Sequence, residues 1–166
     1  RPTTSQYRLV DALACAGFIN AMQRQCNVVT LANFAQTLNV VGMLVVTPTA
    51  VLRESVFWAL AMQRRHSGDV AIDAWTDCDS YSVDTGRGEA LTPPYLDVSA
   101  TLDTASGRQV VSIVNTHRSE PIETTLVLGS GSRAMVHTLS HDDPLARNTF
   151  ESPDAISPRT SSAECH

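Results

Sequence analysis

The character of the sequence changes near Gly68, and this change limits the folds that the chain can adopt. Before it, apolar residues recur with the spacing of amphipathic helices. After it, short alternating runs are separated by clusters of Gly, Pro, Ser and Thr, which is typical of antiparallel strands joined by turns. The charge changes at the same place: residues 1–68 hold six of the twelve Arg and two carboxylates, whereas residues 69–166 hold six Arg and fifteen carboxylates. The sequence therefore predicts two structural parts, 1–68 and 69–166.

The first part is predicted as helix, strand, helix. Residues 9–25 have the helical period, and Asp11 stands in the first turn, where the helix dipole favours an acid. "CNVVTLA" (26–32) has the β-branched density of a short buried strand. "VLRESVFWALAMQRRHSG" (51–68) predicts a second helix that Gly68 ends. Such a strand needs neighbours on both edges, so this part is predicted to be a piece of a larger fold.

The second part is predicted as an antiparallel β-sandwich. Five runs alternate between apolar and polar residues, and turn clusters such as "TASG" and "HRSEP" separate them. The Pro- and Ser-rich tail, 151–166, is expected to be an extended flap with a frayed end. The predicted strands are residues 69–75, 95–103, 108–116, 122–129 and 132–140.

Composition excludes several classes of function. The net charge of −5 argues against nucleic acid or an anionic membrane as partner, because both require a basic surface. No apolar run reaches the length of a spanning helix. The four Cys lie far apart, at positions 15, 26, 78 and 165, which favours neither a disulfide framework nor a zinc site. We therefore expect no metal or cofactor, and a reducing, cytoplasmic setting.

Three stretches together resemble family 51 α-L-arabinofuranosidases. "DALACAGFINAMQRQCNVVTLANFAQTLNVVG" is similar to the closing part of that family's catalytic barrel. "PPYLDVSAT" resembles a motif in the sandwich that follows the barrel, and "ARNTFESPDAISP" resembles the closing segment. The matches are in the family's order and extend from about Val10 to Pro158. The resemblance implies an α+β chain: the end of a (β/α)8 barrel over 1–68, followed by a C-terminal antiparallel β-sandwich over 69–166.

The resemblance also implies a function and one site residue. It implies the C-terminal part of an enzyme that releases terminal arabinofuranose from arabinan or arabinoxylan in L-arabinose metabolism. The family's Gln at the position of Gln36 faces the arabinose subsite, so Gln36 is predicted to bind the sugar. An amide can both donate to and accept from sugar hydroxyls. The alternative is that Gln36 only solvates a local helix; Asn33 and Asn39 are predicted to bond to loop backbone. The family also implies a homo-oligomer.

No catalytic residue is predicted in this chain. A retaining glycosidase needs two carboxyl groups about 5 Å apart. The first part offers only Asp11 and Glu54, which are better explained as groups at the starts of two helices. The family's two glutamates lie in Asn-Glu-Pro and Glu-Trp contexts, and neither occurs here. Alone, the chain is therefore expected to be inactive.

Other residue types that could carry chemistry have simpler explanations. "SHDD" (140–143) holds triad residue types, but sequence neighbours cannot adopt the triad geometry. His137 and His141 are predicted to be surface residues and Trp58 a core residue. Trp75, Tyr81 and Tyr95 could form a sugar-stacking platform, although packing is the commoner role of such rings. Two alternatives therefore stay open: a stand-alone carbohydrate-binding sandwich, and an inactive truncated remnant.

Overall fold

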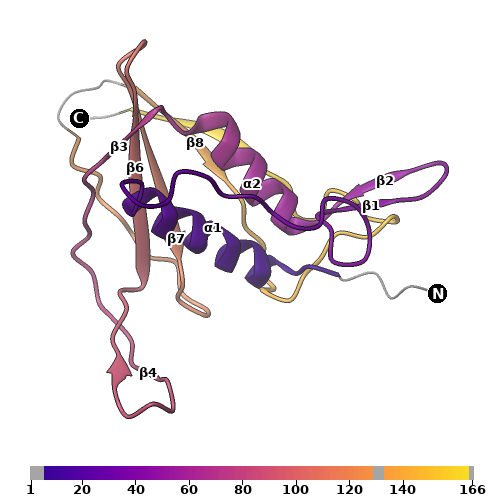
Figure 1. Ribbon diagram of the computed structural model, residues 1–166, viewed down its shortest axis with the longest axis horizontal. Helices are drawn as coiled ribbons and strands as arrows, with labels where there is room; N and C mark the ends of the chain where they lie inside the picture. Colours follow the sequence, from indigo (N-terminus) through magenta and orange to yellow (C-terminus); the bar gives the residue numbers. More distant parts are fainter. Residues whose placement is uncertain (1–5, 129–132, 165–166) are drawn as a thin grey trace. The chain divides into compact units, whose positions relative to one another are not determined.

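The computed structural model describes residues 6–128 and 133–164, which fold as α+β with antiparallel sheets (Figure 1). These residues divide into two compact units. Unit 1 comprises Arg1–Cys15, Asn33–Arg65 and Glu123–His166, and unit 2 comprises Ala16–Ala32 and His66–Ile122. The boundary between the units passes through the first helix, α1 (Leu9–Arg24).

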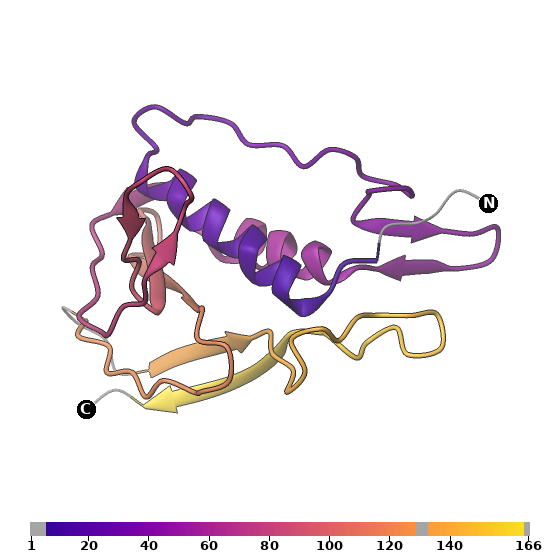
Figure 2. The same cartoon turned by 90° about the horizontal axis from the view of Figure 1, so that it is seen from below.

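Unit 1 combines the start of α1 with two hairpin-like ribbons and a second helix. Strands β1 (Leu44–Val46) and β2 (Val51–Arg53) pair antiparallel, and α2 (Ser55–His66) follows directly. Strands β8 (Arg133–Thr138) and β9 (Arg159–Glu164) form a second antiparallel ribbon, visible in Figure 2. Because only a short turn separates Val46 from Val51, the chain reverses direction and β1 and β2 pair antiparallel.

The core of unit 1 is small and includes polar side chains. Asn148, 2% exposed, donates to the carbonyls of Arg53 and Ile156 at 2.9 Å each and accepts from the Ile156 N–H at 2.7 Å. These bonds join two segments far apart in sequence and satisfy the buried backbone groups that they meet. The buried apolar residues are Leu9, Ala12, Val45, Leu52, Val56, Ala59 and Ile156.

Unit 2 is built around a three-stranded antiparallel sheet of order β3-β6-β7. The strands are β3 (Val70–Ile72), β6 (Leu96–Asp103) and β7 (Arg108–Asn115), and β6 lies in the centre. Because β6 has neighbours on both edges, it holds most of the buried residues of the sheet, Leu96, Ser99, Ala100 and Thr101. The short strands β4 (Val83–Asp84) and β5 (Ala90–Leu91) form a separate exposed hairpin.

A polar network holds the second half of α1 against β6 within unit 2. Asn20 is fully buried and donates to Asp97 Oδ1 at 2.8 Å. The Ser99 hydroxyl lies 2.9 Å from Asn20 Oδ1 and 2.6 Å from Gln23 Oε1. Arg24 forms an ion pair with Asp97 at 2.8 Å. These bonds fix which residues of α1 face β6, since a shift would leave Asn20 buried without partners.

The predicted helices are confirmed, with different bounds for the second. Residues 9–25 correspond to α1, and Asp11 caps it by accepting from Arg8 N at 2.7 Å. The predicted helix over 51–68 is wrong at its start, because 51–53 pair with β1 as β2. Gly68 is required for a reason other than ending α2: a Cβ there would lie 2.2 Å from the backbone carbon of Leu102.

The predicted strand at 26–32 is not formed. No described residue pairs with this segment, and Val28 and Leu31 are 74% and 77% exposed. A strand is stable only when its backbone groups bond to a neighbour, and the described residues provide none here. β-branched composition alone was therefore a misleading signal.

Of the five strands predicted after residue 68, four correspond to β3, β6, β7 and β8. The fifth, 122–129, is wrong over its described part, because 122–128 form no strand. The tail prediction is also wrong for 159–164, which form β9 along the whole of β8. Residues 165–166 of the tail, and the turn cluster "GSGS" (129–132) between two of the predicted strands, lie outside the described residues.

The α+β class with antiparallel sheets is thus established, while the boundary at residue 68 and the barrel assignment stay predictions. No helix among the described residues is both long enough and apolar enough to cross a bilayer.

Candidate functional site

The predicted sugar-binding residue, Gln36, lies on an exposed loop of unit 1 that connects residue 33 to β1. Its side chain is exposed, and the Ala35–Gln36 peptide bond is cis. The loop does not follow a strand, as noted above. Its role in binding sugar therefore stays a prediction.

The residues after Gln36 form a tight turn closed by backbone hydrogen bonds. The N–H of Leu44 donates to the Thr37 carbonyl at 3.1 Å, and the N–H of Asn39 donates to the Leu44 carbonyl at 2.7 Å. Within the turn, the N–H of Gly42 donates to the Asn39 carbonyl at 2.5 Å. A Cβ on Gly42 would lie 2.6 Å from the Leu38 carbonyl carbon, so only glycine fits. Backbone hydrogen bonds therefore join the two ends of the turn, and its interior has no room for a side chain at Gly42.

Asn39 closes this turn with its side chain, as predicted for a partner of loop backbone. Its Oδ1 accepts from the N–H of Val46 at 2.7 Å, in the strand that follows. Asn39 and Val40 have φ of 53° and 50°, in the left-handed region. Asn enters this region readily, but for β-branched Val40 it is an outlier that costs ~1–3 kcal/mol. In contrast, no described residue hydrogen-bonds to the side chain of Asn33.

Tyr7 holds the same loop from the segment before α1. Its hydroxyl donates to the Val41 carbonyl at 2.6 Å, and its ring meets the ring of Phe34 edge to face, with centroids 6.1 Å apart. Tyr7 was not predicted to belong here, because it lies 34 residues from Val41 and no local pattern links the two.

Glu54 is a buried carboxyl in unit 1, immediately before α2. It is 1% exposed and accepts from the N–H of Tyr7 at 3.2 Å. Burial raises the pKa of its carboxyl to about 7; the Tyr7 hydrogen bond and the charge of Arg147 oppose this, and the charge of Asp11 adds to it. Glu54 lies at the start of the helix as predicted, although directly before its first residue, Ser55, and its carbonyl accepts from the N–H of Phe57 at 3.0 Å.

Neither carboxyl of the first part is placed for catalysis on a sugar in the described structure. Glu54 is closed off from solvent, and Asp11 is engaged in capping α1. A retaining mechanism needs both carboxyls beside the bond that is cleaved. The absence of a catalytic pair from the chain stays a prediction.

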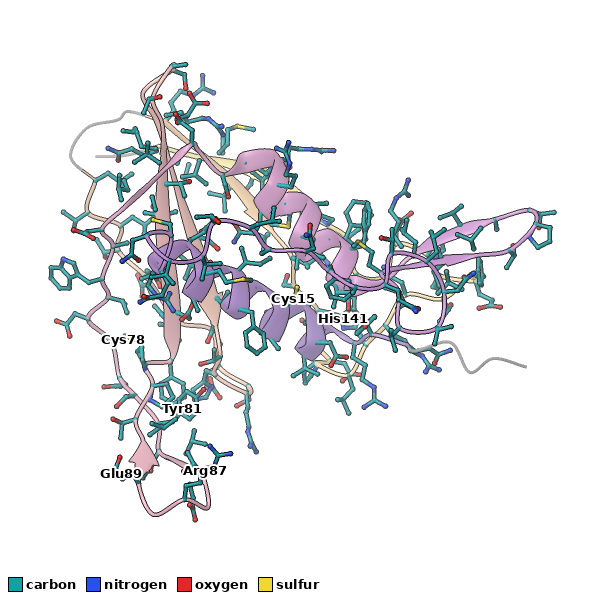
Figure 3. All side chains as sticks on the ribbon, in the orientation of Figure 1. Cys15, Cys78, Tyr81, Arg87, Glu89 and His141 are labelled. Carbon is teal, nitrogen blue, oxygen red and sulfur yellow. The ribbon has the colours of Figure 1, made fainter. Side chains whose placement is uncertain are left out.

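The aromatic residues considered for sugar stacking do not form one platform. Tyr81 and Tyr95 stack on each other, with centroids 5.1 Å apart and planes at 27°, and His117 lies against Tyr95 at 4.7 Å. Tyr81 is at the base of the β4–β5 hairpin, which carries Arg87 and Glu89 (Figure 3). Trp75 is 86% exposed.

Trp58 is half-buried on α2 and packs edge to face against Phe57. The guanidinium of Arg53 lies 5.8 Å from the Phe57 ring centre and 5.5 Å from that of Trp58. Trp58 therefore packs against neighbouring side chains but is not one of the fully buried core residues, as the sequence had predicted it to be.

The remaining candidate groups serve local structure. His141 Nδ1 accepts from the N–H of Asp143 at 3.0 Å, within an exposed turn, and His137 Nδ1 lies 3.0 Å from the Thr160 hydroxyl across the β8–β9 pair. Cys15, Cys26 and Cys78 are free thiols, and Cys165 lies outside the described residues. Among residues 6–128 and 133–164, no group of three His, Cys, Asp or Glu could hold a metal ion.

Comparison with known proteins identifies the family. A family model described as "Alpha-L-arabinofuranosidase C-terminal domain" matches residues 1–166. The chain is 33% identical, over 86% of its length, to a probable alpha-L-arabinofuranosidase C of Aspergillus flavus. It is 26% identical, over 92% of its length, to an intracellular exo-alpha-(1->5)-L-arabinofuranosidase of Streptomyces lividans.

Solved structures give the same fold. The chain superposes on the alpha-L-arabinofuranosidase of Thermotoga maritima, solved as an arabinose complex, with a TM-score of 0.84 and 24% identity, covering 96% of this chain. It spans 35% of that structure and 28% of the Aspergillus flavus relative. The chain thus corresponds to roughly a third or less of the proteins that it matches. On these matches, it belongs to the C-terminal domain family of the α-L-arabinofuranosidases.

Proposed function

We propose that the chain forms the C-terminal part of an α-L-arabinofuranosidase, which releases terminal arabinofuranose from arabinan or arabinoxylan fragments. The observation that carries this is the family match over residues 1–166, together with 33% identity to a probable arabinofuranosidase. In this proposal the two catalytic glutamates belong to another part of the longer protein. They act through a covalent glycosyl-enzyme intermediate.

Gln36 contributes one wall of the arabinose subsite. Its side chain is exposed and neutral, as recognition of a neutral sugar requires. Its amide donates to one sugar hydroxyl and accepts from another. This fixes the ring of the substrate relative to the catalytic carboxyls.

Exposed apolar side chains support the proposal that residues 1–68 complete a larger barrel. Val28, Leu31, Leu38 and Val40 are between 47% and 77% exposed within two neighbouring stretches. Val28 and Leu31 lie in unit 2, and Leu38 and Val40 lie in unit 1. Within each unit, exposed apolar side chains of this kind indicate a surface that another part of a protein covers. In this proposal the rest of the enzyme covers these side chains, and residues 69–166 form the sandwich that packs against the barrel.

The test is Gln36→Ala in the complete enzyme, assayed on an aryl α-L-arabinofuranoside. Loss of one or two hydrogen bonds to the sugar predicts a fall in kcat/KM of about tenfold to a hundredfold. Gln25→Ala is the matched control, because Gln25 is an exposed amide at the end of α1. If kcat and KM of Gln36→Ala equal those of the wild type, Gln36 does not belong to the site.

A stand-alone carbohydrate-binding module is the second candidate, favoured by one observation. Trp75 is 86% exposed, and a freely exposed indole offers a stacking face to a sugar ring. The stacked pair Tyr81–Tyr95 argues against a platform of three rings, since each ring covers a face of the other. Retardation of the chain in a gel that contains arabinoxylan, abolished by Trp75→Ala, would favour this candidate. Equal mobility with and without the polysaccharide removes it.

Two further features of the proposed enzyme are a homo-oligomeric state and an intracellular setting. Light scattering of the complete enzyme tests the first.

A further inference from the structure

We propose that Asn39 and Tyr7 are positioning residues for Gln36: together they hold the loop so that the Gln36 amide is presented in one place. This inference rests on the proposed role of Gln36 in binding sugar. It adds two residues to the site, neither of which needs to touch the substrate.

The first support is the closure of the turn that follows Gln36. Asn39 bonds through three of its polar groups: its N–H to the Leu44 carbonyl, its carbonyl to the N–H of Gly42, and its side-chain oxygen to the N–H of Val46. Val46 belongs to β1, whose register with β2 fixes its place. The side chain of Asn39 therefore connects the loop to a paired strand.

The second support is that the backbone before Gln36 is anchored as well. The Phe34 ring packs against Tyr7, and the Tyr7 hydroxyl bonds to the Val41 carbonyl on the far side of the loop, at 2.6 Å. The backbone N–H of Tyr7 in turn donates to the buried carboxyl of Glu54. Tyr7 is thus fixed on its own side while it contacts the loop at two points.

These anchors leave little freedom at Gln36. Phe34 is held two residues before it, and the Thr37 carbonyl accepts from Leu44 one residue after it. Only Ala35 and Gln36 lie between the anchored positions. A left-handed Val40 within the same loop agrees with this, because such a residue persists only where its surroundings determine the backbone.

The consequence for binding follows from preorganisation. An exposed glutamine on a mobile loop loses conformational freedom when it binds a sugar, and this loss weakens affinity. When Asn39 and Tyr7 hold the loop in the free protein, most of this conformational freedom has already been lost during folding, and sugar binding loses little more. The two residues therefore act on substrate affinity, through Gln36.

The kinetic test is a double-mutant cycle in the complete enzyme. Asn39→Ala is expected to raise KM about tenfold and to change kcat less than twofold, since it removes order and not a group that reacts. In the Gln36→Ala background the same substitution should change KM less than twofold, because its effect depends on Gln36. Tyr7→Phe, which removes only the hydroxyl, should behave in the same way with a smaller effect.

Two further variants separate positioning from a general loss of stability. Asn39→Asp keeps an acceptor oxygen and tolerates a left-handed φ, so it should restore KM to within about threefold of the wild type. Asn115→Ala is the matched control, because Asn115 closes a turn in unit 2 through the N–H of His117 and the carbonyl of Glu120. It should leave KM unchanged even if it lowers the melting temperature.

A measurement on the chain itself distinguishes failure of this inference from failure of the proposed function. The backbone 15N order parameter of Gln36 is expected to be near the rigid value of about 0.85 in the wild type and to fall below about 0.6 in Asn39→Ala. If it is equal in the two proteins, or if the effects of Asn39→Ala and Gln36→Ala on KM are additive, positioning is refuted. If Asn39→Ala loosens Gln36 but Gln36→Ala leaves KM and kcat unchanged, the loop is held as inferred and the sugar-binding role is wrong.

Discussion

The buried carboxyl of Glu54 predicts that the stability of the chain falls as pH rises from about 5 to 8. Its pKa is raised from 4.5 to about 7 in the folded chain, chiefly by burial. Below pH 4.5 the carboxyl is protonated in both the folded and the unfolded states, and burial has no ionic cost. As pH rises through 7 the unfolded chain has already lost the proton, so folding must either retain a proton or bury a charge.

The size of this effect follows from the change in pKa. Each pH unit is worth ~1.4 kcal/mol, so the free energy of unfolding should fall by roughly 3 kcal/mol across this range. Glu54→Gln removes the ionisable group but keeps an oxygen that can accept from the N–H of Tyr7. The variant should therefore match the wild type within about 1 kcal/mol at pH 5 and exceed it by roughly 2–3 kcal/mol at pH 8.

Urea unfolding followed by tryptophan fluorescence at several pH values between 5 and 8 measures the difference directly. Contributions from all other groups are common to both proteins and cancel in the difference. Glu123→Gln, at an exposed position, is the control and should leave the pH dependence as in the wild type. Parallel curves for the wild type and Glu54→Gln would show that burial does not raise this pKa, and the reasoning would be refuted.

Three further substitutions test the packing. Asn148→Ala removes the donor to the carbonyls of Arg53 and Ile156 and the acceptor for the N–H of buried Ile156. It should lower the free energy of unfolding by roughly 3 kcal/mol, read from the urea midpoint at constant m-value, and a loss under 1 kcal/mol would contradict this. Gly68→Ala places a methyl group 2.2 Å from the backbone of Leu102 and should lower the free energy of unfolding by roughly 1–3 kcal/mol, measured in the same way. If the variant and the wild type are equally stable, the close approach is absent. Trp75→Ala, at an exposed position, should change stability by less than about 0.5 kcal/mol; a larger loss would place Trp75 in a packed interface.

Much of the candidate site could be predicted only because the local motif resembles a family. Gln36 was predicted from its sequence context, and its role stays a prediction. Asn39 was correctly predicted to bond to loop backbone, whereas no described residue bonds to the side chain of Asn33. Tyr7 and Glu54 were not predicted to join this part of the molecule. The hydrogen bond between the Tyr7 N–H and the Glu54 carboxyl joins residues 47 positions apart, and no periodicity or motif at either residue predicts it.

The sequence by itself determined the elements whose signals are local. The 3.6-residue period located α1, and the alternation of apolar and polar residues located β6 and β7. These features depend on residues a few positions apart, so a short window contains all the information they need.

Only the tertiary structure decided which extended segments become strands and which polar groups are buried. Residues 26–32 have strand composition but no strand partner in the part of the chain that the structure describes, whereas 159–164 have a weak signal and pair fully with β8. A strand requires backbone bonds from a distant segment, and the burial of Glu54 and Asn148 requires distant segments to close over them. No local pattern encodes such contacts, because their free energy arises only when the distant segments meet.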